Sequence, residues 1–469
     1  MNPPEPPVIA TPARRRRAVF LKLAGIAGLI LLLHIPLILT NGVLAERKGY
    51  QQQAVAEISS LWGRDQVVTG PVLAVPYAYK TQVIRPKVVA GKAVQVEETE
   101  LTAATAYFLP ETLTVHGSVE TEVRHRGIYD AVVYGTKLKL SGSLLADFAA
   151  AGIDADRIDW DRACVLFGVA DLRGVRSVSP LQISGGKAAV FESADGAEGA
   201  FLPLAARIEG AVPGARLEFA FEAALQGSER LQIAPVGKLT AVALESAWPD
   251  PSFCGAYLPV NRSIGATGFK AQWEISHFSR GFAQSWTGRL MKPAEIAQKI
   301  GAASFGVTFA QPVDGYRMAE RAEKYGLLFF VLVFAVFFLF EMTAALRIHP
   351  LQYALVGAGL CLFFLGFLAL SEFLAMGFAY GVAAAACTAL VSLYAWSFLH
   401  TGRRTLVILG GLTVTYGYLY FVLRSQDFAL LAGTAALFVA LALVMYCTRR
   451  INWYAPEIDP PNAPARQVL

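Results

Sequence analysis

The sequence predicts a membrane protein that combines α-helical spans with an all-β (β-rich) extracytoplasmic domain. Six apolar stretches are each about 20 residues long, the length that a helix needs to cross about 30 Å of hydrocarbon. Between the first stretch and the other five, residues 41–324 have the alternation and turn residues of an ordinary water-facing domain. The composition agrees, because 55% of the residues are hydrophobic and 16% are charged, against about 25% charged in typical soluble domains.

Residues 1–17 form a basic N-terminal segment that ends in four consecutive arginines, and residues 18–40 form the first apolar stretch. An arginine-rich start before an apolar run is also typical of a cleavable signal peptide, and Val43-Leu44-Ala45 has the small residues of a cleavage site. The apolar core of a signal peptide spans only about 7–15 residues, which is shorter than this run. We therefore interpret residues 18–40 as an uncleaved transmembrane helix, with Lys22 near the membrane interface.

Residues 41–324 are predicted to form one large domain that begins with a helical segment and continues in strands. Apolar side chains at helical spacing in residues 44–62 extend the first helix to a break near Gly63. Beyond it the period is mostly two, most clearly in residues 269–275, where apolar and polar side chains alternate. Further predicted strands cover residues 67–79, 113–123, 137–144, 216–225 and 238–247. Many short strands separated by turns favour a β-sandwich or two stacked sheets.

The C-terminal region, residues 325–447, is predicted to form a bundle of five transmembrane helices. The apolar stretches cover residues 327–346, 351–370, 373–393, 405–423 and 428–447. Each is long enough to span the hydrocarbon core of a bilayer. Residues 448–469 contain four prolines and few apolar side chains, so we expect a disordered cytoplasmic tail.

The arginines in the short segments predict the orientation, because cytoplasmic loops carry an excess of Lys and Arg. With the N-terminus inside, the inner segments carry the N-terminal arginines together with Arg347, Arg403, Arg404, Arg449 and Arg450. In the two short outer turns, Arg424 is the only Lys or Arg residue. We therefore expect both termini in the cytoplasm, a multi-pass protein of the cell inner membrane, and a periplasmic domain if the cell is Gram-negative.

The sequence lacks the common catalytic motifs. It has no G-x-S-x-G nucleophile elbow, no H-E-x-x-H zinc motif, no phosphate loop and no dinucleotide-binding glycine motif. The six histidines are dispersed, so we expect no metal site, no cofactor and no enzyme activity. The net charge is +5, and the basic residues lie at helix ends. This distribution does not predict nucleic-acid binding. Cys164 and Cys254 share the outer domain, where a disulfide between them remains an open alternative.

Four residues of the membrane region are candidate structural or functional residues. Glu341 lies within the second predicted span, where an acidic group costs about 2.5–3.5 kcal/mol and generally has a partner. Arg347 and His349 follow it closely and are the expected partners. Glu372 lies in the short outer turn, where we expect it to be solvated and to cap a helix. For Glu341 a structural role is favoured over a role in a proton or solute path.

Several motifs, taken in order, resemble those of one family. They are Gly70-Pro71-Val72-Leu73-Ala74-Val75-Pro76, Leu109-Pro110-Glu111, Arg126-Gly127-Ile128-Tyr129, Asp171-Leu172-Arg173-Gly174, Trp248-Pro249-Asp250-Pro251, Gly268-Phe269-Lys270-Ala271-Gln272-Trp273, His349-Pro350-Leu351-Gln352-Tyr353 and Arg450-Ile451-Asn452-Trp453-Tyr454. With them the chain resembles the CreD family, inner-membrane proteins named for cell envelope integrity. The family commonly has His after the Ser-Glu of the outer turn, whereas this chain has Phe373.

The resemblance implies a function in envelope integrity or in the response to envelope stress, and it implies no catalytic residues. The leading hypothesis is a non-enzymatic protein that acts through its periplasmic domain on other envelope proteins or on the cell wall. The main alternative is a transporter or a lipid-handling protein that uses the C-terminal helix bundle around Glu341. An envelope hydrolase is a third, less favoured hypothesis.

Overall fold

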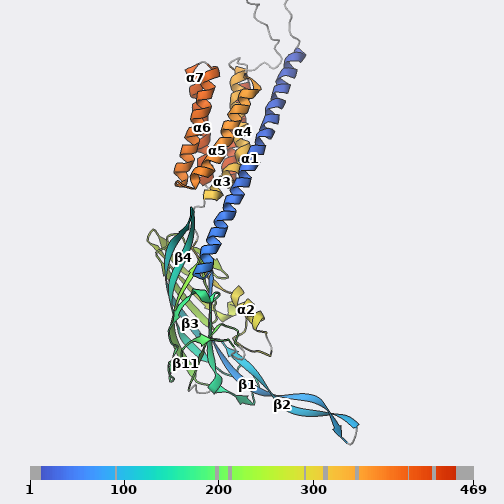
Figure 1. Ribbon diagram of the computed structural model, residues 1–469, viewed down its shortest axis with the longest axis vertical. Helices are drawn as coiled ribbons and strands as arrows, with labels where there is room; N and C mark the ends of the chain where they lie inside the picture. The colour runs from blue at the N-terminus through green and yellow to red at the C-terminus, as the bar shows by residue number, and fades with distance from the viewer. Residues whose placement is uncertain are drawn as a thin grey trace, which may run out of the picture. The chain divides into compact units, whose positions relative to one another are not determined.

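The computed structural model describes residues 12–89, 92–195, 200–209, 214–289, 292–309, 315–343, 348–399, 401–424 and 429–449 (Figure 1). The chain forms two compact units. We call Met1–Tyr50 with Val313–Leu469 the helical unit, and Gln51–Pro312 the β-domain.

The first helix, α1, is continuous over Pro12–Trp62. This confirms that the helix runs on past the first apolar stretch and breaks at Gly63, whose φ of 103° lies in the left-handed region. The amide of Gly63 and that of Arg64 both donate to the Ser59 carbonyl, which closes the last turn. Glycine is the usual residue at this position because the conformation penalises a Cβ atom.

The remaining helices of the helical unit follow one another closely in sequence. They are α3 (Gly315–Lys324), α4 (Gly326–Thr343), α5 (Pro350–Ser371), α6 (Met376–Leu399), α7 (Gly402–Arg424) and α8 (Ala429–Thr448). Among the described residues, three of these are long and apolar enough to cross a membrane, namely Pro350–Ser371, Met376–Ser397 and Gly402–Arg424. A fourth apolar stretch, Gly326–Phe338, is shorter.

Over the part of the chain that the structure describes, the prediction of a five-helix C-terminal bundle is therefore corrected to three long apolar helices and a shorter one. The polar helix α3 ends at Lys324, and α4 begins at Gly326, close to the expected start at residue 327. The helix α4 comprises 18 residues, Gly326–Thr343, and its described apolar stretch covers Gly326–Phe338. The last expected span, residues 428–447, corresponds to α8, Ala429–Thr448.

Aromatic side chains fill the interior of the helical unit. The Phe363 and Tyr416 rings lie 4.6 Å apart between centroids, and Phe329 packs on the same tyrosine at 4.8 Å. The Tyr380 hydroxyl donates to the Tyr416 carbonyl at 2.7 Å, so a buried hydroxyl is satisfied. Large apolar side chains such as Leu351 and Val414 are exposed on the outside, as expected of helices in contact with lipid.

The β-domain contains two sheets, as the alternating segments predict. The first comprises β1 (Gln66–Val89), β2 (Lys92–Phe108), β5 (Arg157–Ile158), β6 (Cys164–Gly168), β9 (Glu192–Ser193), β10 (Leu204–Arg207), β12 (Arg230–Ile233), β14 (Ser252–Gly255), β17 (Ser285–Thr287) and β18 (Phe305–Thr308). The second comprises β3 (Thr112–Arg126), β4 (Tyr129–Leu145), β7 (Val175–Val178), β8 (Gln182–Ile183), β11 (Arg216–Ser228), β13 (Leu239–Ser246), β15 (Asn261–Gly265) and β16 (Gly268–Ser276). A helix, α2, spans Pro293–Ala302.

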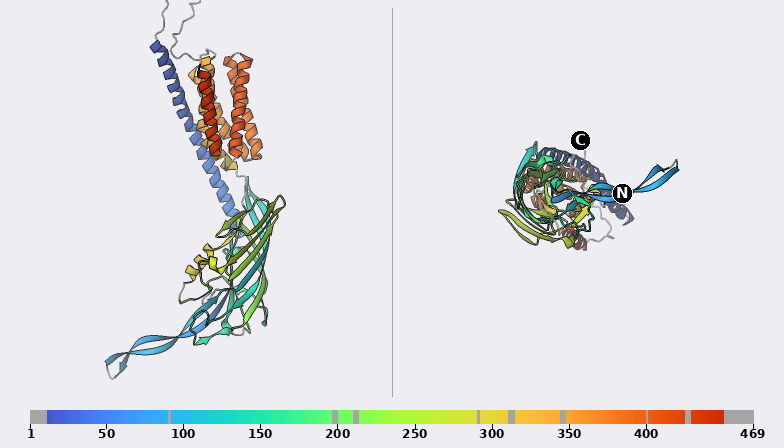
Figure 2. Two further views of the ribbon diagram at one scale, coloured as in Figure 1. Left: turned by 180° about the vertical axis from the view of Figure 1, so that it is seen from behind. Right: turned by 90° about the horizontal axis from the view of Figure 1, so that it is seen from below.

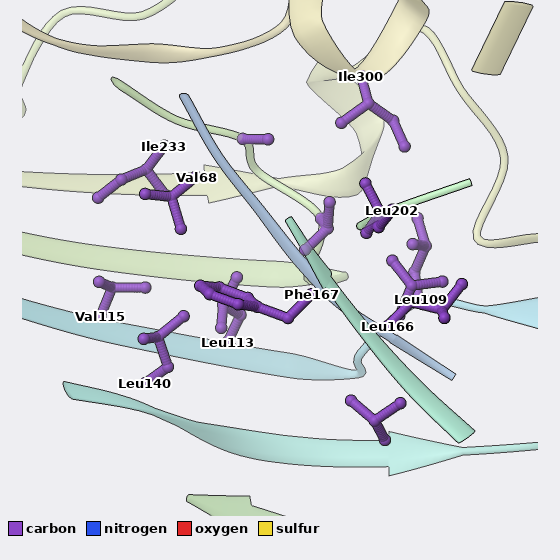
Figure 3. Packing of buried hydrophobic residues seen from close by; sticks show 14 of the residues in the cluster. Val68, Leu109, Leu113, Val115, Leu140, Leu166, Phe167, Leu202, Ile233 and Ile300 are labelled. Atoms are coloured by element: carbon purple, nitrogen blue, oxygen red, sulfur yellow. The ribbon is translucent and has the colours of Figure 1, made fainter. Parts of the chain in front are cut away.

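Strict alternation places the apolar side chains of the second sheet on one face. In β16, Phe269, Ala271, Trp273 and Ile275 are buried while the polar residues between them are exposed. These side chains join those of the first sheet in one continuous core. Figure 3 shows part of it, with buried side chains from both sheets gathered in the core, among them Val68, Leu113, Val115, Leu140, Phe167 and Ile233.

The strands β1 and β2 continue beyond the sheet as a two-stranded ribbon (Figures 1 and 2). They pair with each other from Leu73–Phe108 out to Val89–Lys92. On its other edge β1 pairs no further than Ala78, with β5. The outer part of the ribbon therefore has two free edges among the described residues, and its charged side chains and Pro86 oppose pairing with other strands.

Candidate functional site

A buried carboxylate lies among the helices α1, α4 and α5. Glu341 of α4 is 8% exposed and forms an ion pair with Lys22 of α1. Its Oε2 accepts a hydrogen bond from the Tyr353 hydroxyl at 3.1 Å, and its Oε1 accepts from the Ile348 amide at 3.2 Å. Lys22 donates a second hydrogen bond to the Ile348 carbonyl at 3.2 Å. We call Lys22, Glu341, Ile348 and Tyr353 the buried charge cluster.

The expected pairing of Glu341 with His349 is wrong. His349 instead caps α5: its Nδ1 accepts from the Leu351 amide at 3.2 Å, and its own amide donates to Gln352 Oε1 at 2.9 Å. Arg347 lies outside the described residues. Lys22, interpreted from the sequence as an interface residue, holds the carboxylate, although it is 319 positions away in the chain.

Depth in the membrane is the signal that could have found this pair. Lys22 follows the start of the first apolar stretch closely, and Glu341 precedes the end of the second by a similar number of residues. Two helices that run in opposite directions place such residues at the same level. Opposite charges at one depth in lipid stabilise each other, because neither is otherwise solvated.

The cluster is suited to holding helices together. Each oxygen of the carboxylate already has a donor, and the lysine has two acceptors, so the polar atoms are satisfied within the cluster. Glu341 is the only acidic residue in the described parts of α4 to α8 and of residues 18–40 of α1. A proton path would need ionisable groups beyond those of the buried charge cluster. The described parts of these helices offer none next to the cluster.

A second group of charged residues lies near α3. Glu372, expected to be solvated, is instead largely covered, with a side chain that is 9% exposed. Its Oε1 lies 3.5 Å from Nε of Arg47 and accepts from the Tyr316 hydroxyl at 3.2 Å. Side chains of α1 and α3 therefore cover the turn. The local sequence around the turn does not show that these distant side chains pack there.

Two glutamates of α3 have opposite surroundings. Glu320 forms ion pairs with Lys48 and, at 2.9 Å, with Lys324, and hydrogen bonds from both lysines lower its pKa to about 2. Glu323 is 4% exposed, and neither carboxylate oxygen has a hydrogen-bond partner within the described residues. Burial, and to a lesser degree the charge of Glu320, raises the pKa of Glu323 to about 7. Sequence reasoning missed Glu323 because a helical pattern does not show what covers its polar face.

Comparison with known proteins identifies the family. The family model described as "Inner membrane protein CreD" matches residues 18–454. The chain is also similar to the inner membrane protein CreD of Escherichia coli (strain K12), with 32% identity over 451 residues that cover 93% of this chain and 94% of that protein. The chain belongs to the CreD family of inner membrane proteins. This confirms the resemblance read from the motifs.

The cysteines of this CreD-family protein are unpaired where the structure describes them. Cys164 lies in β6 and Cys254 in β14, and both are free thiols, so the open alternative of a disulfide between them is not realised. Instead the Thr308 hydroxyl donates to Sγ of Cys254 at 3.3 Å. Across the described ranges no three His, Cys, Asp or Glu side chains gather in a way that could hold a metal ion.

Proposed function

We propose that this inner membrane protein maintains the integrity of the cell envelope, without enzyme activity, through a β-domain that faces the periplasm. The observation that carries the proposal is the β-domain itself. Its two sheets share one continuous apolar core, which makes a rigid scaffold, and one sheet leaves a polar cleft of about 730 Å³ open. A rigid scaffold with an open cleft is suited to binding another envelope component. The excess of arginines in the segments assigned to the cytoplasm supports the orientation.

A deletion strain tests this function. Loss of the protein should make cells more sensitive to envelope stress by detergent with EDTA, and the full chain should restore resistance. A photoreactive residue in place of Lys187, in the β-domain, should crosslink to envelope components in living cells. The same residue in place of Arg403 serves as the control and should not. Unchanged resistance of the deletion strain would overturn the proposal.

The proposed topology keeps the first helix attached. α1 is continuous through Val43, Leu44 and Ala45, and Leu44 is 1% exposed, whereas a signal-peptidase site needs an accessible, extended chain. We therefore expect the intact mass of the purified protein to include residues 14–17. A chain that begins at Glu46 would contradict the anchor.

A transporter or a lipid-handling protein is the second candidate, because the buried charge cluster lies among apolar helices, where ionisable residues often mark transport paths. Purified protein in liposomes tests it directly. Proton- or substrate-coupled flux that Glu341→Gln abolishes, in protein that remains folded, would favour transport over the envelope role. The complete pairing of Glu341 with Lys22 and Tyr353 argues for the structural role.

A further inference from the structure

The cleft of the β-domain lies on the face of the first sheet that carries Ala74, Cys164 and Arg207. Across the paired strands β1, β6 and β10, Ala74 is aligned with Cys164, and Cys164 with Arg207. Their side chains share one face, because residues directly opposite each other in a ladder point the same way. The neighbouring positions Val165 and Ala206 are fully buried on the opposite, core-facing side.

Small side chains create the space. Ala74, Pro76, Cys164 and Ala205 line the cleft, where longer side chains would fill it. The segment from Lys187 to Val190 forms a wall and is held by backbone hydrogen bonds between Leu181 and Ala189 at 2.7 and 2.9 Å. The volume of about 730 Å³ is within the range of about 300–1,000 Å³ found for small-molecule sites.

The charges in the cleft favour an anion. Arg162, Lys187 and Arg207 line it, together with Glu192 and Glu209. Lys187 lies 3.6 Å from Glu209, but both side chains are highly exposed, so this pair contributes little. Arg207 makes no ion pair with any side chain in the described ranges. Burial raises the pKa of the Cys164 thiol, which keeps the floor beside this arginine neutral.

We propose that this cleft binds a small ligand through a carboxylate or phosphate group held by Arg207. A guanidinium binds such oxyanions with two parallel hydrogen bonds, which makes arginine well suited to their recognition. The rest of the ligand would lie over Ala74, Pro76 and Ala205, so a short peptide or a comparable organic anion fits better than an inorganic ion. The inference rests on the proposed function, since it names the ligand class of the domain assigned to the envelope.

Binding to the full-length protein in nanodiscs, measured by calorimetry at low salt, tests the proposal. The probes are N-acetyl-trialanine with a free carboxylate, the same peptide as its C-terminal amide, and inorganic phosphate. We expect the carboxylate peptide to bind and the amide to bind about tenfold more weakly or worse, because a charged hydrogen bond is lost. Binding of phosphate alone, without the peptide, would identify phosphate as the source of the oxyanion.

The variant Arg207→Ala should weaken binding by about tenfold or more, while Arg207→Lys should keep part of it. Lys270→Ala is the matched control, because Lys270 lines a separate cleft of about 600 Å³ in the β-domain and is 78% exposed. Equal binding of acid and amide, no binding of either anion, or unchanged binding by Arg207→Ala would overturn the inference.

Complementation of the deletion strain is measured separately from ligand binding. Loss of binding by Arg207→Ala supports the inference whether or not the variant restores a deletion strain. The failure of the wild-type protein itself to affect envelope stress would overturn the proposed function, and the binding result would be unaffected.

Discussion

At the scale of single residues, the buried charge cluster illustrates how a pair of charges constrains three helices. Removing one partner leaves the other charge without compensation, which costs about 3–5 kcal/mol for a fully buried pair and less here, because Lys22 is 29% exposed. Glu341→Gln should therefore lower the amount of folded protein in the membrane, with function falling in proportion. The double variant Lys22→Met with Glu341→Gln should recover abundance, because no charge is left unpaired.

The measurement for this prediction combines membrane abundance with complementation of a deletion strain. Normal abundance of Glu341→Gln with failed complementation would instead indicate a working residue in a transport path. Normal values of both would show that the carboxylate is not structurally required.

A second residue-scale prediction concerns pH. Glu323 has a pKa raised from about 4.5 to about 7, so the folded protein holds its proton more tightly than the unfolded chain. The stabilisation is complete below the unfolded pKa and is lost as pH rises from about 4.5 through 7. Glu323→Gln should therefore reduce the difference in melting temperature between pH 5 and pH 8, mainly by raising the value at pH 8.

Glu320 provides the control of opposite sign. Its pKa is lowered to about 2 by Lys48 and Lys324, so its contribution is present above about 4.5 and is lost as pH falls toward 2. Glu320→Gln should lower the melting temperature at both pH 5 and pH 8. An identical pH profile for wild type and Glu323→Gln would contradict the assignment for Glu323.

At the scale of elements, the end of α1 depends on one glycine. A Cβ atom at Gly63 would lie 2.6 Å from the Gly174 Cα and 3.0 Å from the Gln226 carbonyl oxygen, and φ is already 103°. Gly63→Ala should therefore destabilise the β-domain by more than about 1 kcal/mol through strain and overlap with backbone atoms. Thermal unfolding of the purified protein measures this.

Gly49→Ala is the matched control for Gly63, because Gly49 lies in the same helix and nothing lies within 4 Å of an added Cβ. Alanine favours a helix interior over glycine by up to about 1 kcal/mol, so this variant should be neutral or slightly stabilising. Equal behaviour of the two variants would show that the break after Trp62 does not depend on the backbone conformation of glycine.

The elements themselves could be predicted from local pattern, whereas their partners could not. The alternation in β16 and the helical spacing up to Trp62 are local, and both segments form the expected structure. The parallel pairing of β3 with β13 joins residues that are far apart in sequence, as does the ion pair of Lys22 with Glu341. Such long-range contacts depend on how whole elements pack against each other. The periodicity of apolar residues and the hydropathy of a segment do not encode that packing.

The number of spans shows the same limit. Apolar length alone predicted a full span over residues 327–346, whereas the described apolar stretch of α4, Gly326–Phe338, is shorter. The cleft around Arg207 was also invisible in the sequence, because the small side chains that make it lie on three separate strands. Only the paired register of β1, β6 and β10 brings them together.

At the scale of the whole molecule, the orientation in the inner membrane is the prediction on which the proposed function depends. Arginine is retained on the cytoplasmic side during insertion, and this chain places Arg14 to Arg17, Arg403 and Arg404 in segments assigned to that side. A reporter that is active only in the cytoplasm should therefore be active when fused at Gly402. A reporter active only in the periplasm should be active at Gly185, in the turn after β8.

Both fusions are needed, because either one alone is compatible with a wrong number of spans. An active cytoplasmic reporter at Gly185 would place the β-domain inside the cell and remove the basis for its proposed contact with the envelope. An active periplasmic reporter at Gly402 would mean that α4, α5 and α6 together cross the membrane an even number of times, for example because α4 does not cross while α5 and α6 do. Since the two reporters report on opposite sides of the membrane, agreement at both positions would fix the β-domain outside and the turn between α6 and α7 inside.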